Sequence, residues 1–236
     1  MARTKKSDIS PHDSAVAFAL YVNDLLDRDG TTGDTIQWAA PFPGQLGPKE
    51  TFLTQAPFQL REFTALQWRD GTSTAQSPGV AAILTGSAAD AVVMGQAVGT
   101  IIASSRRRDA ETPQWRVIDS GLVYISILGF YMQTARSILP WPWESIQSGE
   151  LVGPGMFKFS GESTSGAVTY IIESDMAELI FTLWSRIVHP VNPQFTSGAW
   201  IPTGWADHME AAGLTIQRLT RRWSSIAPST TKTLPR

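Results

Sequence analysis

The sequence predicts an α+β fold in which an antiparallel β barrel or sandwich is closed by a C-terminal helix, with N-terminal helices packed alongside. Three observations predict it. The chain opens with a helical pattern, short β-rich runs broken by turns begin at Trp115, and an amphipathic helix follows them between Asp175 and Val188. A chain of 236 residues is long enough to bury a substantial core.

The first helix is expected over residues 11–29. Ser10 is a good N-cap, Pro11 suits the first helical position and Asp13 lies in the first turn, where a negative charge is favourable. Gly30 follows as the stop signal. The apolar stripe of this helix comprises Val16, Leu20, Leu25 and Leu26.

An irregular connection is predicted after this helix. Residues 31–59 are rich in Gly, Pro and Thr and should carry one short strand, whereas PFPGQLGPKE at 41–50 cannot hold a regular element. Residues 59–69 could form a strand or a short helix, and residues 71–79 form a loop. Whether residues 1–80 fold separately stays open.

Residues 81–105 are apolar and rich in small side chains, and Arg106–Arg108 follow them directly. The bulky apolar residues of this segment favour membrane insertion by about −4 kcal/mol in total. The central Asp90 opposes insertion by about 2.5 to 3.5 kcal/mol, and the polar residues cancel the remainder. We therefore expect a buried helix and no transmembrane span. Gly95 and Gly99 lie on one face and would allow close packing against another helix or a second copy.

Six short strands are expected in the middle of the chain. The alternation of Met156, Lys158 and Ser160 with Phe157 and Phe159 is typical of a half-buried strand. The expected strands are 115–118, 122–127, 137–141, 144–152, 156–160 and 167–173, with turns at 119–121, 153–155 and 162–166.

A helix should cover this β region. Ser174 and Asp175 open it, and Glu178 stands three residues after Asp175, as in a capping box. Pro190 and Pro193 stop it. Its apolar positions, at three-four spacing, are Met176, Leu179, Ile180, Leu183, Trp184, Ile187 and Val188.

Three regions follow from these patterns. Residues 1–110 are helical and irregular, and residues 111–190 form the β domain with its capping helix. Residues 191–236 hold a Trp/Pro loop, a short helix from Asp207 and a basic tail.

Residues 106–190 resemble bacterial PH-like domains of the GRAM-related kind. The resemblance lies in the basic run at 106–110, the Pro113–Val117 segment, the Ile138–Ile146 segment and the later helix. It implies a small barrel capped by a helix, with a binding or scaffolding role, and it does not imply an enzyme. The family's Thr-x-x-Arg is absent, since residues 125–128 read ISIL. No ligand-contacting residue transfers, because the binding loops of such domains vary most.

Catalytic and metal-binding patterns are missing from the sequence. The chain has no cysteine, which excludes disulfides, thiolate metal sites and thiol catalysis, and it has no nucleotide-binding or hydrolase motif. His12 and His189 stand at helix ends, and near His208 only Asp207 and Glu210 share a helical face. We predict no catalytic residue, no metal site and no cofactor.

The candidate binding residues are tryptophans beside prolines and clustered arginines. Rigid exposed aromatic rings would anchor a partner protein, but the same rings could instead complete the core beneath loops. The arginines could contact an anionic lipid surface, or simply complement a helix dipole. The set comprises Arg106, Arg107, Arg108, Trp141, Trp143, Trp200, Trp205, Arg218, Arg221 and Arg222.

The sequence thus predicts a non-enzymatic interaction module that binds a protein partner or an anionic membrane surface. The alternatives are a structural subunit of a homo-oligomer and an enzyme of unrecognised class. The N-terminus has no apolar run typical of a signal peptide, so we expect a cytoplasmic location, including the inner face of the membrane. A net charge of −2 argues against nucleic acid as a partner.

Overall fold

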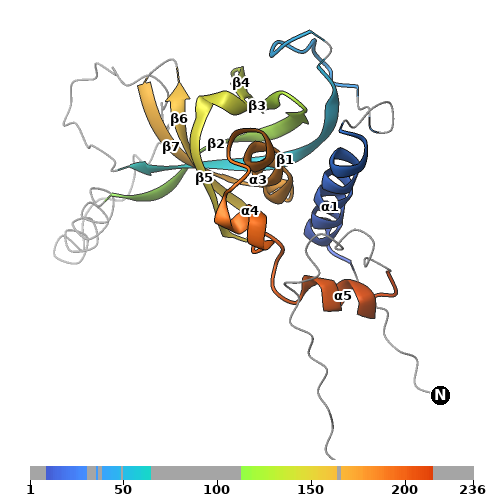
Figure 1. The fold of residues 1–236 in the computed structure, drawn as a ribbon. Helices are drawn as coiled ribbons and strands as arrows, with labels where there is room; N and C mark the ends of the chain where they lie inside the picture. Colours follow the sequence, from blue (N-terminus) through green and yellow to red (C-terminus); the bar gives the residue numbers. More distant parts are fainter. Residues whose placement is uncertain are drawn as a thin grey trace, which may run out of the picture.

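The computed structural model describes residues 9–30, 36, 39–48, 50–64, 113–163 and 166–214. The expected helix at 81–105, the arginines Arg106–Arg108 and the basic tail lie outside this part of the chain. The elements in chain order (Figure 1) are α1 (Pro11–Asp29), β1 (Phe52–Thr64), β2 (Gln114–Ser126), β3 (Gly129–Thr134), β4 (Ile138–Pro142), the 3-10 helix η2 (Trp143–Ser145), β5 (Ile146–Gly153), β6 (Met156–Ser163), β7 (Gly166–Glu173), α3 (Ala177–Val188), α4 (Pro193–Ser197) and α5 (Trp205–Ala211).

The strands form one seven-stranded sheet in the order β4-β3-β2-β1-β7-β6-β5, and every neighbouring pair is antiparallel. The predicted α+β class with an antiparallel sheet is confirmed. The sheet is strongly curved (Figure 1). Its curvature brings Trp141 of β4 within ring contact of the other half of the sheet, with centroid distances of 5.2 Å to Phe159 and 6.2 Å to Tyr170.

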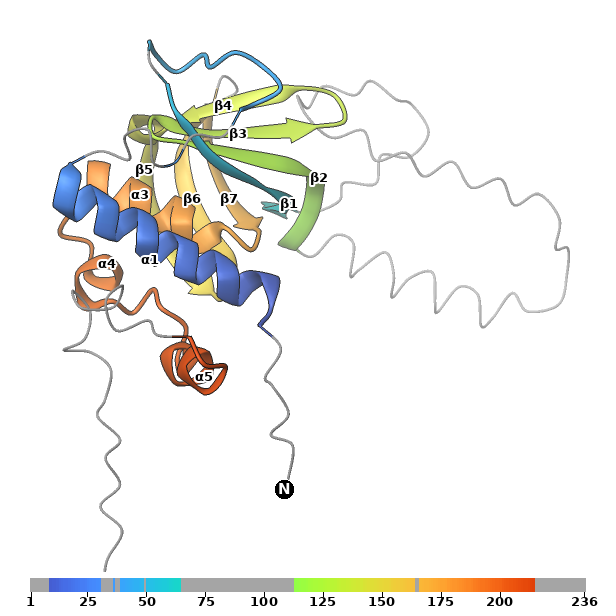
Figure 2. The same cartoon turned by 90° about the vertical axis from the view of Figure 1, so that its right-hand side faces the viewer.

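The main core lies between this sheet and two helices. In Figure 2, α1 and α3 lie on the same side of the sheet. Of the apolar stripe predicted for α1, Val16 and Leu20 are buried in this core, Leu26 is partly buried against it, and Leu25 is buried outside the cluster. Leu179, Ile180, Leu183 and Trp184 of α3 are buried in the same core. Both predicted helices are therefore confirmed as amphipathic elements that face the core. At the ends of the two helices, Arg186 of α3 donates to Asp27 of α1 at 2.8 Å.

The irregular segment 39–50 covers part of the opposite face of the sheet. Phe42 contacts the rings of Phe52, Tyr124 and Tyr131 at centroid distances of 5.0 to 5.6 Å. The Tyr131 hydroxyl accepts hydrogen bonds from the backbone N–H groups of residues 45 and 46 and donates to Glu50 at 2.6 Å. Burial and this carboxylate raise the pKa of Tyr131 to about 12. As predicted, the described part of 41–50 holds no helix or strand.

Two expectations about the strands are wrong. The turn predicted at 119–121 does not exist, because β2 runs unbroken through it and pairs with β1 from Gln114 to Ser126. Gly121 instead allows β2 and β3 to approach closely, because a Cβ at this position would clash with the carbonyl oxygen of Gln133 on β3. Strand β3 itself was not predicted. Of the segment 59–69, residues 59–64 belong to a strand, which decides between the two alternatives for this part, and residues 65–69 lie outside the described residues.

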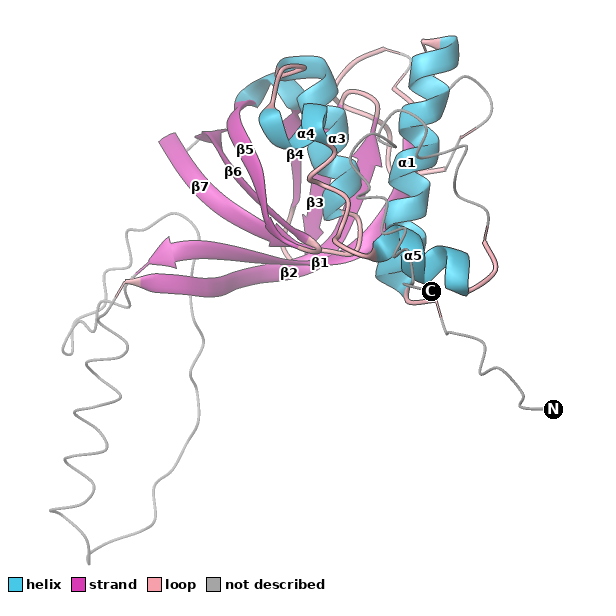
Figure 3. Cartoon of the chain, turned by 60° about the horizontal axis from the view of Figure 1, so that its bottom comes forward, coloured by secondary structure: helices cyan, strands magenta, loops and turns pink. Residues whose placement is uncertain are grey.

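The sheet also crosses the expected boundary near residue 110. Strand β1, from the predicted N-terminal region, lies between β2 and β7 in the sheet, and α1 shares the main core. Beyond the sheet, the ends of β1 and β2 extend together as a two-stranded arm (Figure 3). The described residues of 9–214 therefore contribute to one sheet and one main core.

Candidate functional site

The four tryptophans proposed as exposed anchors are buried. Trp141, Trp143, Trp200 and Trp205 expose 6%, 1%, 2% and 3% of their surface, respectively. The expectation of exposed rings is wrong, and the alternative in which they complete the core is correct, because large aromatic surfaces gain most when removed from water. None of the six candidate arginines is among the described residues, so the basic-surface hypothesis stays a prediction.

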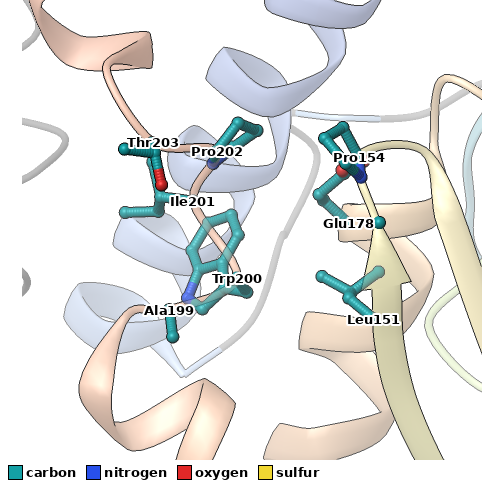
Figure 4. Close-up of a pocket in the computed structure, with 9 residues that line it drawn as sticks. Leu151, Pro154, Glu178, Ala199, Trp200, Ile201, Pro202 and Thr203 are labelled. Atoms are coloured by element: carbon teal, nitrogen blue, oxygen red, sulfur yellow. The ribbon is translucent and has the colours of Figure 1, made fainter.

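A pocket of about 170 Å³ lies between the β5–β6 turn, the start of α3 and the α4–α5 connection. Its lining consists of Leu151, Gly153, Pro154, Glu178 and residues 199–203. Figure 4 shows Trp200, Ile201 and Pro202 on one side and Leu151, Pro154 and Glu178 on the other. Most of the side chains that line the pocket are apolar, and Glu178 and Thr203 add a carboxylate and a hydroxyl.

The side of the pocket that contains Trp200, Ile201 and Pro202 is its first wall, and it belongs to the segment 198–204, which joins α4 to α5. It is bounded by Gly198 and Gly204, both in the left-handed backbone region with φ of 73° and 77°. The Gln194 side chain anchors α4 to β5, because it accepts from Leu151 N–H and donates to Leu151 O, both at 2.9 Å. The Gln194 amide thus makes the two backbone hydrogen bonds that a neighbouring strand would make at this edge, and it holds α4 and the wall that follows it against the sheet.

Glu178 supplies the charge on the second wall. Its side chain is 1% exposed, and Oε1 accepts from the Gly155 backbone N–H at 2.8 Å and lies 2.9 Å from His12 Nε2. Oε2 is buried and has no hydrogen-bond partner among the residues that the structure describes. The carboxylate therefore joins α3 to the β5–β6 turn and to α1, and keeps one acceptor oxygen uncommitted.

This arrangement corrects the expected role of Glu178. The sequence predicts a capping box with Asp175, yet α3 begins after Met176 and has no side-chain cap. A capping glutamate would have to reach back to its own N-cap backbone. The turn at Gly155 and the imidazole of His12 use the carboxylate instead.

The pair with Glu178 also changes the acidity of His12. The hydrogen bond to Glu178 raises the pKa of His12 above its ordinary value of 6.5, against the effect of burial, which lowers it. The negative charges of Asp175 and Asp13 act in the same direction as the hydrogen bond. On α5, His208 Nε2 lies 3.5 Å from Asp13 Oδ2. The predicted position of His12 at a helix start is confirmed, but its partner was not predicted.

The pocket combines apolar side chains with two polar ones, the carboxylate of Glu178 and the hydroxyl of Thr203. In the described ranges, no group of three or more His, Asp or Glu residues could hold a metal ion. No helix in those ranges is both long and apolar enough to cross a bilayer.

Comparison with known proteins found no matching family model, curated protein or solved structure. The case for function therefore depends on the geometry of this chain.

Proposed function

We propose that the protein is a non-enzymatic interaction module of PH-like architecture, and that the pocket beside Glu178 is its binding site. Two features support the architecture. Strands β2, β3 and β4 pair in sequence order, and so do β5, β6 and β7, whereas β4 and β5 are joined through η2 without pairing. Strand β1 lies between β2 and β7 and so links the two halves of the sheet. An amphipathic helix, α3, then comes directly after the last strand. A small barrel with a helix at its C-terminal end is what the resemblance implies.

The size of the pocket is the observation that most directly supports a role in binding a partner protein. Pockets for drug-sized molecules measure about 300 to 1,000 Å³, whereas a cavity of about 150 Å³ holds benzene. A pocket of about 170 Å³ therefore suits a single side chain better than a whole metabolite. A side chain of that size reaches the pocket as part of a partner protein, which favours protein binding.

Occupancy of the pocket can be tested by NMR titration of the full-length protein with small, benzene-sized fragments. The variant Ala199→Leu adds bulk at an exposed lining position and should abolish the shifts. The matched control Ala211→Leu makes the same change at an exposed position of α5 outside the pocket and should preserve them. Failure of every fragment to bind the wild-type protein would contradict the proposed site.

A second candidate function, self-assembly, is favoured by apolar exposure on the β1–β2 arm. Phe63 and Val117 are 57% and 50% exposed, and Phe63 lies across from Trp115 with a ring distance of 5.6 Å. Exposed apolar clusters of this kind often mark interfaces. Light scattering coupled to size exclusion decides this candidate: a defined oligomer that Phe63→Glu dissociates supports assembly, and a monomeric wild type excludes it.

The membrane-surface hypothesis depends on arginines outside the described residues. If it holds, the protein should sediment with anionic vesicles at low salt, and replacing Arg106, Arg107 and Arg108 with Ala should release it. The absence of sedimentation for the wild type would exclude this version.

A further inference from the structure

We propose that the pocket takes the side chain of a lysine from a partner protein, with the ammonium group paired to Glu178 Oε2 and the methylene stem against the apolar walls. This inference rests on the proposed function and names the chemistry that the site recognises. Three features of the site support a lysine: the charge of Glu178, the apolar side chains of the lining and the number of free acceptors.

The charge comes from the carboxylate. Glu178 is almost completely buried, and a buried polar oxygen without a hydrogen bond is energetically costly, so a donor that reaches Oε2 gains more there than it would in water. Oε1 is already bound to Gly155 and His12. The remaining oxygen can therefore accept from an incoming group without breaking an existing contact.

The lining matches an amphipathic side chain. Leu151, Pro154 and Ile201 present hydrocarbon to the pocket, and Trp200 adds an aromatic ring. Lysine buries its methylene stem against such surfaces while its charged head pairs with a polar group. An indole ring also attracts cations. A benzene-sized volume accommodates this stem.

The number of acceptors separates lysine from arginine. A guanidinium carries five N–H donors in a fixed fork and binds best to two acceptor atoms at once. Only one carboxylate oxygen of Glu178 is uncommitted, and Thr203 contributes a hydroxyl oxygen to the same lining. A compact ammonium group fits this arrangement better than a planar fork.

Entry requires the wall to move. Oε2 is buried, so an ammonium reaches it only after neighbouring residues shift, and in this proposal the residues that shift are 199–203, which face Pro154 and Glu178 across the pocket. The two glycines that bound this segment, Gly198 and Gly204, adopt backbone angles that other residues rarely take. Residues at such positions often absorb the backbone rotation when a segment moves.

The test is an NMR titration of the full-length protein with Nα-acetyl-lysine amide and Nα-acetyl-norleucine amide. The two probes share their first three methylene groups, but norleucine ends in a methyl group at the position of lysine Cε and so lacks the ammonium group. We expect the lysine probe to bind the wild type at least about 10-fold more tightly. Glu178→Gln keeps an acceptor for Gly155 N–H and should remove this preference.

Two further variants keep the test decisive if Glu178→Gln does not fold. Ala199→Leu should weaken binding of the lysine probe at least about 10-fold, and the matched control Ala211→Leu should leave it unchanged. Equal binding of both probes to the wild type would overturn the lysine proposal while leaving the pocket as a binding site. Binding of neither probe would overturn both. Lysine-selective binding that Ala199→Leu does not weaken would place the lysine elsewhere and overturn the assignment.

Discussion

Removing the imidazole of His12 tests whether the contact with Glu178 holds α1 to the rest of the fold. His12→Ala deletes a contact of 2.9 Å to a carboxylate that is 1% exposed. Breaking a fully buried ion pair costs about 3 to 5 kcal/mol. Here the cost is lower, because the His12 side chain is 22% exposed and the Gly155 N–H remains bound to Glu178. A hydrogen bond to a charged group contributes about 1.5 to 3 kcal/mol, so we expect a loss of about 2 kcal/mol.

The loss should depend on pH with a definite sign. The pKa of His12 is raised above its ordinary value of 6.5, so the folded state binds the proton more tightly than the unfolded state does. The contribution of the charged pair is therefore complete below about pH 6.5 and is lost as the pH rises through the raised pKa. The difference between wild type and His12→Ala should be largest near pH 6 and smaller near pH 9.

Chemical denaturation of both proteins at about pH 6 and pH 9 measures this difference. For a chain of this size, about 2 kcal/mol corresponds to a decrease in Tm of about 4 to 8 °C. His208→Ala is the matched control, because His208 is 38% exposed and lies 3.5 Å from Asp13, a contact that contributes at most about 1 kcal/mol. A cost for His12→Ala below about 0.5 kcal/mol near pH 6, or an equal cost at both pH values, would refute the reasoning.

Three other substitutions, the first with a matched control, test the fold. Gly161→Ala places a Cβ against the backbone carbonyl of Ser145 and should cost about 1 to 3 kcal/mol in denaturation, whereas Gly153→Ala, which meets only ordinary contacts, should cost little. Gln194→Ala removes two hydrogen bonds to the edge of β5 and should cost about 1 to 2 kcal/mol, with faster hydrogen exchange at that edge. Tyr131→Phe should release the segment 39–50, seen as faster amide exchange there, and unchanged exchange would contradict the contact.

Elements whose signals are local could be predicted from the sequence. Ser10 and Asp13 form a reciprocal capping box, with Asp13 N–H donating to Ser10 Oγ at 3.0 Å and Ser10 N–H donating to Asp13 Oδ2 at the same distance. Gly30 closes the helix at φ 68°. Both ends of α1 depend on residues within a few positions of one another, and for this reason the predicted bounds 11–29 are confirmed.

Elements that depend on partners far away in the sequence could not be predicted. The sequence at 119–121 resembles a turn, but all three of its residues pair with β1, and this pairing keeps the strand extended. Glu178 has the spacing of a cap, but its partners lie on α1 and in the β5–β6 turn. A single sequence contains no periodicity that links His12 to Glu178, so the pair was missed. The same limit applies to the pocket, whose lining comes from three separate segments.

The wall of the pocket and the β5 edge of the sheet are connected through shared contacts. Gln194 binds both backbone groups of Leu151, and Leu151 also lines the pocket. Asn192, just before α4, donates to Gly149 O at 3.4 Å, and His189 Nε2 lies 3.1 Å from Gln147 O, so the unpaired edge of β5 is covered along its length by side chains from one connection. The pocket wall at 198–204 follows α4 directly, so an inserted side chain that displaced this wall far enough would strain the contacts that protect the β5 edge from pairing with another chain. Its binding free energy must offset any loosening of these contacts, which favours a small ligand that displaces only residues 198–204 over a large one that would detach α4.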